Sequence, residues 1–365
     1  MEQIHCQGCG VLVQTNDPHE LGYTPKSSLE RENVLCKRCF RLKHYNEIQD
    51  VSMTDDDFLK MVSSIRNRDA LVVHVIDIFD VNGSMIQSLP RIVGNNPILL
   101  VGNKMDLLPK STNQRKLKQW LQSSAKEAGF KVKDVFLISS IKGHGMDDLT
   151  DRIEYYRENK DVYIVGTTNV GKSTFINRLI KQSIGENEVI TTSYFPGTTL
   201  GFIEIPLDDK TALIDTPGIV NKQQIAHYIS DKDLKVITPN KEIKPRIYQL
   251  NDQQTLFFGG LARLDFIKGE RQSFVCYFSN QLSIHRTKLE KADALYEDHI
   301  GEMLTPPNEE SLAKLPELTT TTFRIHGEKT DIVFPGLGWV SVEGSITVVT
   351  HSPRGVNVTI RKSLI

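Results

Sequence analysis

The feature that most constrains how this chain can fold is an apolar run that breaks into a glycine-rich loop at residues 162–174, VYIVGTTNVGKST. Residues 166–173 match the phosphate-binding pattern G-x-x-x-x-G-K-[ST] in full. The glycines allow successive backbone N–H groups to point at a phosphate, and the helix that follows adds its positive end. The sequence therefore predicts an α/β domain with a nucleoside triphosphate site near the middle of the chain.

Two side chains of this loop carry specific chemistry. Lys172 is expected to pair with the β- and γ-phosphates, and the Ser173 hydroxyl is expected to ligate Mg²⁺. An amphipathic stretch at 175–180 predicts the helix after the loop. The loop residues expected to bind the nucleotide are Gly166, Thr168, Asn169, Val170, Gly171, Lys172, Ser173 and Thr174.

Length and composition bound the class of protein. A chain of 365 residues is too long for one typical core, so two or three domains are expected. A charged fraction of 24% and a net charge of -1 argue neither for nor against nucleic-acid binding. The sequence lacks an apolar run of about 18 residues and a basic-then-apolar leader, so we expect no membrane span, no signal peptide and a cytoplasmic location.

Four of the five cysteines form two C-x-x-C pairs, Cys6 with Cys9 and Cys36 with Cys39. In a reducing compartment, two such pairs predict a closed tetrahedral Zn²⁺ site, whereas disulfides suit secreted domains. The segment between the pairs is polar and rich in turn residues, so bound metal would supply much of its folding free energy.

Basic and aromatic residues are interleaved around the second cysteine pair. They are Lys37, Arg38, Phe40, Arg41, Lys43, His44 and Tyr45. Such a surface could contact RNA phosphates and bases, or it could be a solvated face over a small core. The sequence does not favour one over the other.

Near-continuous β-branched and apolar runs at 70–79, 97–102 and 134–138 predict buried parallel strands. His74 within the first run is interpreted as a packed strand residue rather than a ligand. Residues 50–69 are expected to form a helical connector, and helices are predicted at 111–128 and 146–157. Two further strands are predicted at 201–205 and 211–214.

Four more motifs lie where these strands join loops, at the sheet end where ligands bind in open α/β folds. They are N-K-x-D at 103–106, S-S-x-x-G at 139–143, P-G-x-T at 196–199 and D-x-P-G at 215–218. Together with the phosphate loop, they resemble the five motifs of translation-factor-type GTPases. A single four-residue match would be weak, but five matches at consistent strand ends are specific.

The resemblance implies a role for each motif. Asp106 would accept hydrogen bonds from guanine N1–H and the exocyclic amine, and Asn103 would bond the base from another edge and tie its loop together. Lys104 would lay its alkyl stem on the ring. The backbone around Ser139, Ser140 and Ile141 would meet the guanine O6 atom.

The switch motifs concern the γ-phosphate and Mg²⁺. Thr199 would reach both, Asp215 would hold Mg²⁺ through water, and the Gly218 N–H would sense the γ-phosphate. The expected catalytic residues are Lys172, Asn169, Thr199 and Gly218.

The motifs follow one another in an unusual order, because the base-reading loops precede the phosphate loop. Such circular permutation is tolerated because domain termini often lie close together. With the cysteine pairs, the chain resembles the YqeH family of circularly permuted GTPases over essentially its whole length. That resemblance implies a cytoplasmic, monomeric GTPase in small (30S) ribosomal subunit assembly. Its partners would be that subunit or its rRNA and proteins, with no membrane or DNA partner.

Residue 219 is Ile, where Ras-type enzymes carry a water-orienting Gln. An aliphatic side chain cannot orient water, so slow intrinsic hydrolysis is expected. In GTPases with a similar phosphate loop, an Asn at the position of Asn169 helps to bind K⁺; here it could instead cap the loop. The expected cofactors are therefore GTP/GDP, Mg²⁺, Zn²⁺ and K⁺.

The expected domains are a zinc module at 1–48, the permuted GTPase domain at 49–220 and an α+β recognition domain at 221–365. Residues 221–250 are interpreted as a mobile switch that continues into a linker. Strands are predicted at 254–267, 273–278, 331–334, 338–341, 345–350 and 356–361, with a helix at 288–303 and Cys276 in the core. Residues 221–365 hold 18 Lys and Arg against 17 Asp and Glu, so their composition shows no RNA footprint.

Two alternative functions remain open from sequence. The chain could be an RNA-binding zinc protein whose GTPase domain senses GTP and GDP with little hydrolysis of its own. It could also be a P-loop kinase or ATPase, against which Asn103 and Asp106 argue.

Overall fold

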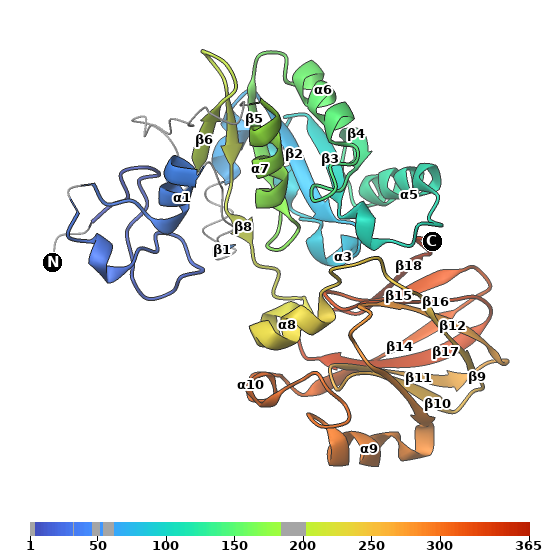
Figure 1. Ribbon diagram of the computed structural model, residues 1–365. Coiled ribbons are helices and arrows are strands. Elements are labelled where there is room, and N and C mark those ends of the chain that lie inside the picture. The colour runs from blue at the N-terminus through green and yellow to red at the C-terminus, as the bar shows by residue number, and fades with distance from the viewer. Residues whose placement is uncertain (1–3, 32, 46–51, 54–61, 184–201) are drawn as a thin grey trace. The chain divides into compact units, whose positions relative to one another are not determined.

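The computed structural model describes residues 4–31, 33–45, 52–53, 62–183 and 202–365. The chain divides into two compact units (Figure 1). The first comprises Met1–Met105 and Gln114–Val220, and the second comprises Asp106–Asn113 and Asn221–Ile365. The cysteine module and the phosphate loop both belong to the first unit.

A six-stranded sheet with the strand order β4-β3-β2-β5-β7-β6 forms the centre of the first unit. All its neighbouring strands are parallel except β6, which runs antiparallel to β7. The predicted parallel sheet is thus confirmed, because apolar runs such as β2 are buried on both faces. The strands are β2 (Ala70–Asp77), β3 (Ile98–Asn103), β4 (Val132–Leu137), β5 (Asp161–Val165), β6 (Ile203–Pro206) and β7 (Ala212–Asp215).

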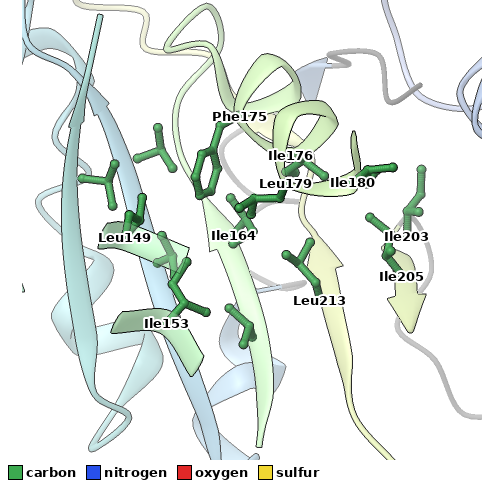
Figure 2. Packing of buried hydrophobic residues seen from close by; sticks show 14 of the residues in the cluster. Leu149, Ile153, Ile164, Phe175, Ile176, Leu179, Ile180, Ile203, Ile205 and Leu213 are labelled. Carbon is green, nitrogen blue, oxygen red and sulfur yellow. The ribbon is translucent and has the colours of Figure 1, made fainter. Parts of the chain in front are cut away.

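The phosphate loop is fixed at both ends by packing. It leaves the buried strand β5 and enters α7 (Lys172–Ser183), whose apolar side lies on the sheet (Figure 2). Phe175 and Ile176 are fully buried, in one core with Ile164 of β5 and Leu213 of β7. Each such side chain contributes roughly 1.5–3 kcal/mol of burial free energy. Among the described residues, the first unit also contains the helices α1 (Lys37–Tyr45), α3 (Val81–Ser84), α4 (Leu89–Val93), α5 (Gln114–Glu127) and α6 (Met146–Arg157).

The segment expected as a helical connector at 50–69 is helical in only part of its described residues, beginning at residues 62–63. Ser52–Met53 form a short strand, β1, which pairs in parallel with β8 (Gly218–Ile219). Ser64–Asn67 form a 3₁₀ turn, and residues 54–61 lie outside the described chain. The helix prediction was wrong at Ser52–Met53 because a distant strand satisfies this backbone, which local sequence cannot reveal.

The second unit is built mainly from two five-stranded antiparallel sheets, ordered β13-β10-β11-β17-β14 and β18-β15-β16-β12-β9. One hydrophobic core lies between them, where Phe258 stacks on Phe278 with ring centroids 4.3 Å apart. Cys276 is buried in this core as predicted. The strands are β9 (Arg246–Leu250), β10 (Gln254–Phe258), β11 (Ala262–Lys268), β12 (Gln272–Phe278), β13 (Ile284–Lys288), β14 (Leu318–Ile325), β15 (Thr330–Phe334), β16 (Gly338–Val342), β17 (Ile346–Pro353) and β18 (Thr359–Lys362).

Residues 221–250 are not a linker. They form a 3₁₀ turn at Ile225–Tyr228, the helix α8 (Asp231–Ile237) and strand β9, and Ile225 and Ile237 are fully buried. Their few apolar residues lack a regular period, so only the tertiary core identifies them as packed.

Other elements of the second unit also differ from expectation, among them strand β13, which was not predicted. The helix expected at 288–303 is reduced to α9 (Ala292–His299), and the short helix α10 (Glu309–Leu312) follows the prolines. Strand β14 was not predicted, because its run of threonines at 319–322 is exposed. None of the helices in the described residues combines the length and apolar character needed to cross a bilayer.

His74 of β2 is fully buried and neutral, as a packed strand residue. Its Nε2 atom accepts the Ile86 N–H at 3.2 Å, and its Nδ1 atom lies 3.4 Å from the Val165 carbonyl oxygen. Burial lowers the pKa of His74 to about 4. In the unfolded chain this imidazole takes up a proton near its ordinary pKa of about 6.5.

Between pH 6.5 and pH 4 the unfolded state therefore binds more protons than the folded state. The free energy of unfolding should decrease by up to about 3 kcal/mol as the pH is lowered through this range. We expect His74→Gln to reduce this pH dependence. The free energy of unfolding is measured by urea titration in a Trp339→Phe background, so that Trp120 is the remaining tryptophan probe. His326→Gln, at an exposed position, is the control and should leave the slope unchanged. An equal slope in His74→Gln would contradict the assignment.

Candidate functional site

The phosphate loop approaches its neighbours so closely that its glycines are required. A Cβ atom at Gly166 would lie 2.7 Å from the Val75 carbonyl oxygen, and one at Gly171 would lie 2.6 Å from Asn103 Nδ2. Gly171 also has a φ of +84°. Lys172 and Ser173 are buried, whereas Thr174 and Asn169 are exposed.

Asn103 joins the phosphate loop to the loop after β4. Its Nδ2 donates to the Val170 carbonyl oxygen at 2.9 Å. Its Oδ1 accepts from the Ser140 N–H at 3.0 Å and from the Ser140 hydroxyl at 2.9 Å. Because Asn103 is only 2% exposed, these bonds form a buried tie between two loops that are far apart in sequence.

The other residues expected to read the base lie around this tie. Ser139 is buried, with its hydroxyl accepting from the Lys142 N–H at 3.1 Å, and the Ile141 side chain is exposed. Lys104 Nζ pairs with Asp77 Oδ2 at 2.7 Å and also donates to the Asn169 carbonyl oxygen. Asp106 is half-buried and begins the segment that groups with the second unit.

Asp77 is a site residue that the sequence reasoning missed. It ends strand β2 and pairs in register with Asn103 at the end of β3. The available signal was its position after a buried apolar run, which it shares with Asn103 and Asp215.

Asp215, at the end of β7, is completely buried between two cations. Lys172 Nζ pairs with its Oδ1 atom, and Arg38 Nη2 pairs with its Oδ2 atom. Arg38 also donates to the Asp215 carbonyl oxygen at 3.2 Å. Burial lowers the pKa of Arg38, but the charges of Asp215, Cys9 and Cys39 outweigh burial, so the net shift is upward.

The residues after Asp215 lie along the phosphate loop. The Thr168 N–H donates to the Ile219 carbonyl oxygen at 2.9 Å, and the Ile219 N–H donates to the Gly166 carbonyl oxygen at 3.3 Å. A Cβ atom at Gly218 would lie 3.2 Å from the Thr168 side chain. Thr199 and its loop lie outside the described residues.

The four N-terminal cysteines form one buried cluster. Their sulfur atoms lie within 4.8 Å of one another, no disulfide joins them, and Cys9 Sγ is 3.8 Å from Cys36 Sγ. A zinc tetrahedron with bonds of about 2.3 Å has edges of about 3.8 Å. The cluster therefore fits Zn²⁺.

The basic residues around this cluster have two different environments. Lys43 and His44 are exposed, and the Arg41 guanidinium lies 5.4 Å from the Tyr45 ring centroid. Arg38, which the sequence grouped with them, is buried on Asp215 and cannot face RNA. The packing of α1 (Lys37–Tyr45) against the sheet buries this arginine.

The fold and these sites define a circularly permuted P-loop GTPase. A family model described as 50S ribosome-binding GTPase matches residues 161–256, and one described as YqeH-like, C-terminal matches residues 271–364. The first match begins at β5, so the base-reading loops lie upstream of it, as permutation requires.

Similarity to individual proteins shows which family the chain belongs to. The chain is 60% identical to the uncharacterized protein YqeH of Bacillus subtilis over 100% of both chains. It is 30% identical to NO-associated protein 1, chloroplastic/mitochondrial, of Arabidopsis thaliana, over 96% of this chain and 72% of that one. The crystal structure of YjeQ from Thermotoga maritima covers 41% of this chain and 48% of its own, with 20% identity and a TM-score of 0.26. The chain belongs to the YqeH family.

The cysteine cluster gives a direct test. Cys36→Ser removes one of four thiolates, so we expect bound zinc to fall from about one ion per chain to well below half, with a lower melting temperature. Cys276→Ala, which alters a cysteine of the second unit's core, should keep its zinc. Zinc released on denaturation and measured colorimetrically checks both variants. Full zinc retention in Cys36→Ser would rule out this cluster as the site.

Proposed function

We propose that this GTPase is a cytoplasmic, monomeric switch protein that acts in assembly of the small (30S) ribosomal subunit. Its partners would be that subunit or its rRNA and proteins. The observation that supports the proposal is the meeting of the phosphate loop, the N-K-x-D and S-S-x-x-G motifs and the D-x-P-G motif at one edge of the sheet, in a chain of the YqeH family. The exposed basic and aromatic residues of the cysteine module offer a surface for RNA.

In this proposal Asn103, Lys104 and Asp106 select guanine, with backbone groups of Ser139, Ser140 and Ile141 at its O6 edge. The Asn103 tie supports this role, because it fixes the base-reading loop to the phosphate loop. A single side chain thus couples recognition of the base to the position of the phosphates.

Hydrolysis would proceed by attack of water in line with the β–γ bond. Lys172 would leave Asp215 for the β- and γ-phosphates, Ser173 and Thr199 would ligate Mg²⁺, and Asp215 would hold it through water. The ion, when bound, would neutralise phosphate charge. The Gly218 N–H senses the γ-phosphate. The bonds between Ile219 and the phosphate loop support a switch segment that responds to the nucleotide.

Asn169 is proposed to bind a K⁺ ion that supplies positive charge to the transferring phosphoryl group. Its side chain is exposed within the phosphate loop, where an ion beside the phosphates could reach it. We expect GTP hydrolysis to be about tenfold faster in KCl than in NaCl, and Asn169→Gly to lose this difference. Asn159→Gly, at an exposed residue with a φ of 61°, is the matched control. Equal rates in the two salts would refute the K⁺ site.

Sedimentation tests the ribosomal role. The protein is expected to migrate with small subunits in one nucleotide state, GDP or a non-hydrolysable GTP analogue, and much less in the other. The family model that matches residues 161–256 is described as a 50S ribosome-binding GTPase, so the gradient must separate small from large subunits. Migration with large subunits alone, or with neither, would overturn the 30S assignment.

The second candidate is an RNA-binding zinc protein whose GTPase domain senses GTP and GDP. The absence of a water-orienting side chain at Ile219 favours it. Multiple-turnover hydrolysis with and without subunits separates the two, because a rate below detection in both conditions would favour the sensor.

A further inference from the structure

Arg38 links the cysteine module directly to the nucleotide site. It lies between Cys36 and Cys39, yet its guanidinium contacts Asp215, which is 177 residues away in sequence. The side chains of Arg38 and Asp215 are 1% and 0% exposed. Both side chains are charged and buried. Each therefore depends on the other, because an unpaired buried charge is strongly unfavourable.

The two oxygens of Asp215 have partners with different freedom to move. Lys172 reaches Oδ1 with a flexible chain from the phosphate loop, and the proposed function moves it to the phosphates. Arg38 holds Oδ2 and the main-chain carbonyl oxygen of the same residue. Because the guanidinium is rigid and planar, these bonds fix the orientation of the carboxylate.

The cysteine module is packed against the sheet, which keeps Arg38 in place. Cys36, Cys39 and Leu42 belong to the same hydrophobic cluster as Ile164 of β5 and Leu213 of β7. A metal ion in the cluster would fix the turn from which Arg38 extends.

We propose that Arg38 is a positioning residue for the magnesium–nucleotide site, through which the cysteine module holds Asp215 ready to accept from a magnesium-bound water. Departure of Lys172 frees Oδ1 for this water while Arg38 keeps Oδ2. The inference rests on the proposed role of Asp215 toward Mg²⁺. It makes the integrity of the cysteine module a condition for tight magnesium-dependent nucleotide binding.

The test is a double-mutant cycle on the full-length protein. The affinity for a fluorescent GDP analogue is measured in magnesium-free buffer and across a Mg²⁺ titration, with zinc content measured in parallel. Arg38→Ala should keep its zinc and its affinity for the analogue without magnesium. The factor by which Mg²⁺ increases that affinity should be about tenfold smaller than in the unmodified protein. Arg38→Lys should recover part of this gain. Arg41→Ala, on the same helix but partly exposed, is the matched control and should keep all of it.

The cycle distinguishes this inference from the proposed function. In an Asp215→Asn background, Arg38→Ala should have less than about a twofold further effect, because the two residues act through one contact. The role of Arg38 alone would be overturned by either of two results. In the first, Mg²⁺ raises the nucleotide affinity of Arg38→Ala and Arg38→Lys as much as that of the unmodified protein. In the second, Arg38→Ala loses as much affinity in the Asp215→Asn background as it does alone. An unchanged gain in Asp215→Asn would overturn the role of Asp215 as well. If Arg38→Ala loses zinc, the double-mutant cycle of Arg38→Lys with Asp215→Asn replaces it, and the same outcomes support or overturn the role of Arg38.

Discussion

The nucleotide site is organised by the neutralisation of one buried carboxylate. Asp215 is completely buried, and such a group is tolerated only when it is paired. Its partners are Lys172 from the phosphate loop and Arg38 from the cysteine module. Three segments far apart in sequence are therefore held at one point. Because removal of one partner leaves a buried charge uncompensated, the pairing constrains all three segments together.

The parallel sheet supplies the geometry on which this pairing depends. Asp77, Asn103, the phosphate loop and Asp215 all follow the carboxyl ends of neighbouring strands. In the sheet order β4-β3-β2-β5-β7-β6, the phosphate-loop strand β5 lies between β2 and β7, although the chain enters the sheet at β2 rather than at β5. Permutation changes the connections but not the strand neighbours, so the site survives it. Its consequence is that β8 is followed directly by residues of the second unit.

Much of the fold could be predicted where a local pattern reports burial. Strands β2, β3 and β5 are buried on both faces, and their apolar runs showed this directly. Residues 221–250 were misread because their packed residues have no period, and β14 was missed because its threonines are exposed. The helix expected through Ser52–Met53 failed because its backbone pairs with β8. In each case the deciding partner is distant in sequence.

The sequence by itself determined the chemistry of this protein. The phosphate loop, the N-K-x-D motif and the two cysteine pairs are each defined by residue types at short fixed spacings, as the ligands expected there require. Only the tertiary structure decided how these parts are connected. Arg38 and Arg41 are equivalent by sequence, yet one is buried on Asp215 and the other remains partly exposed near Tyr45. The physical reason is that the environment of a side chain depends on which surface its helix packs against, and α1 packs on a sheet whose strands lie far along the chain.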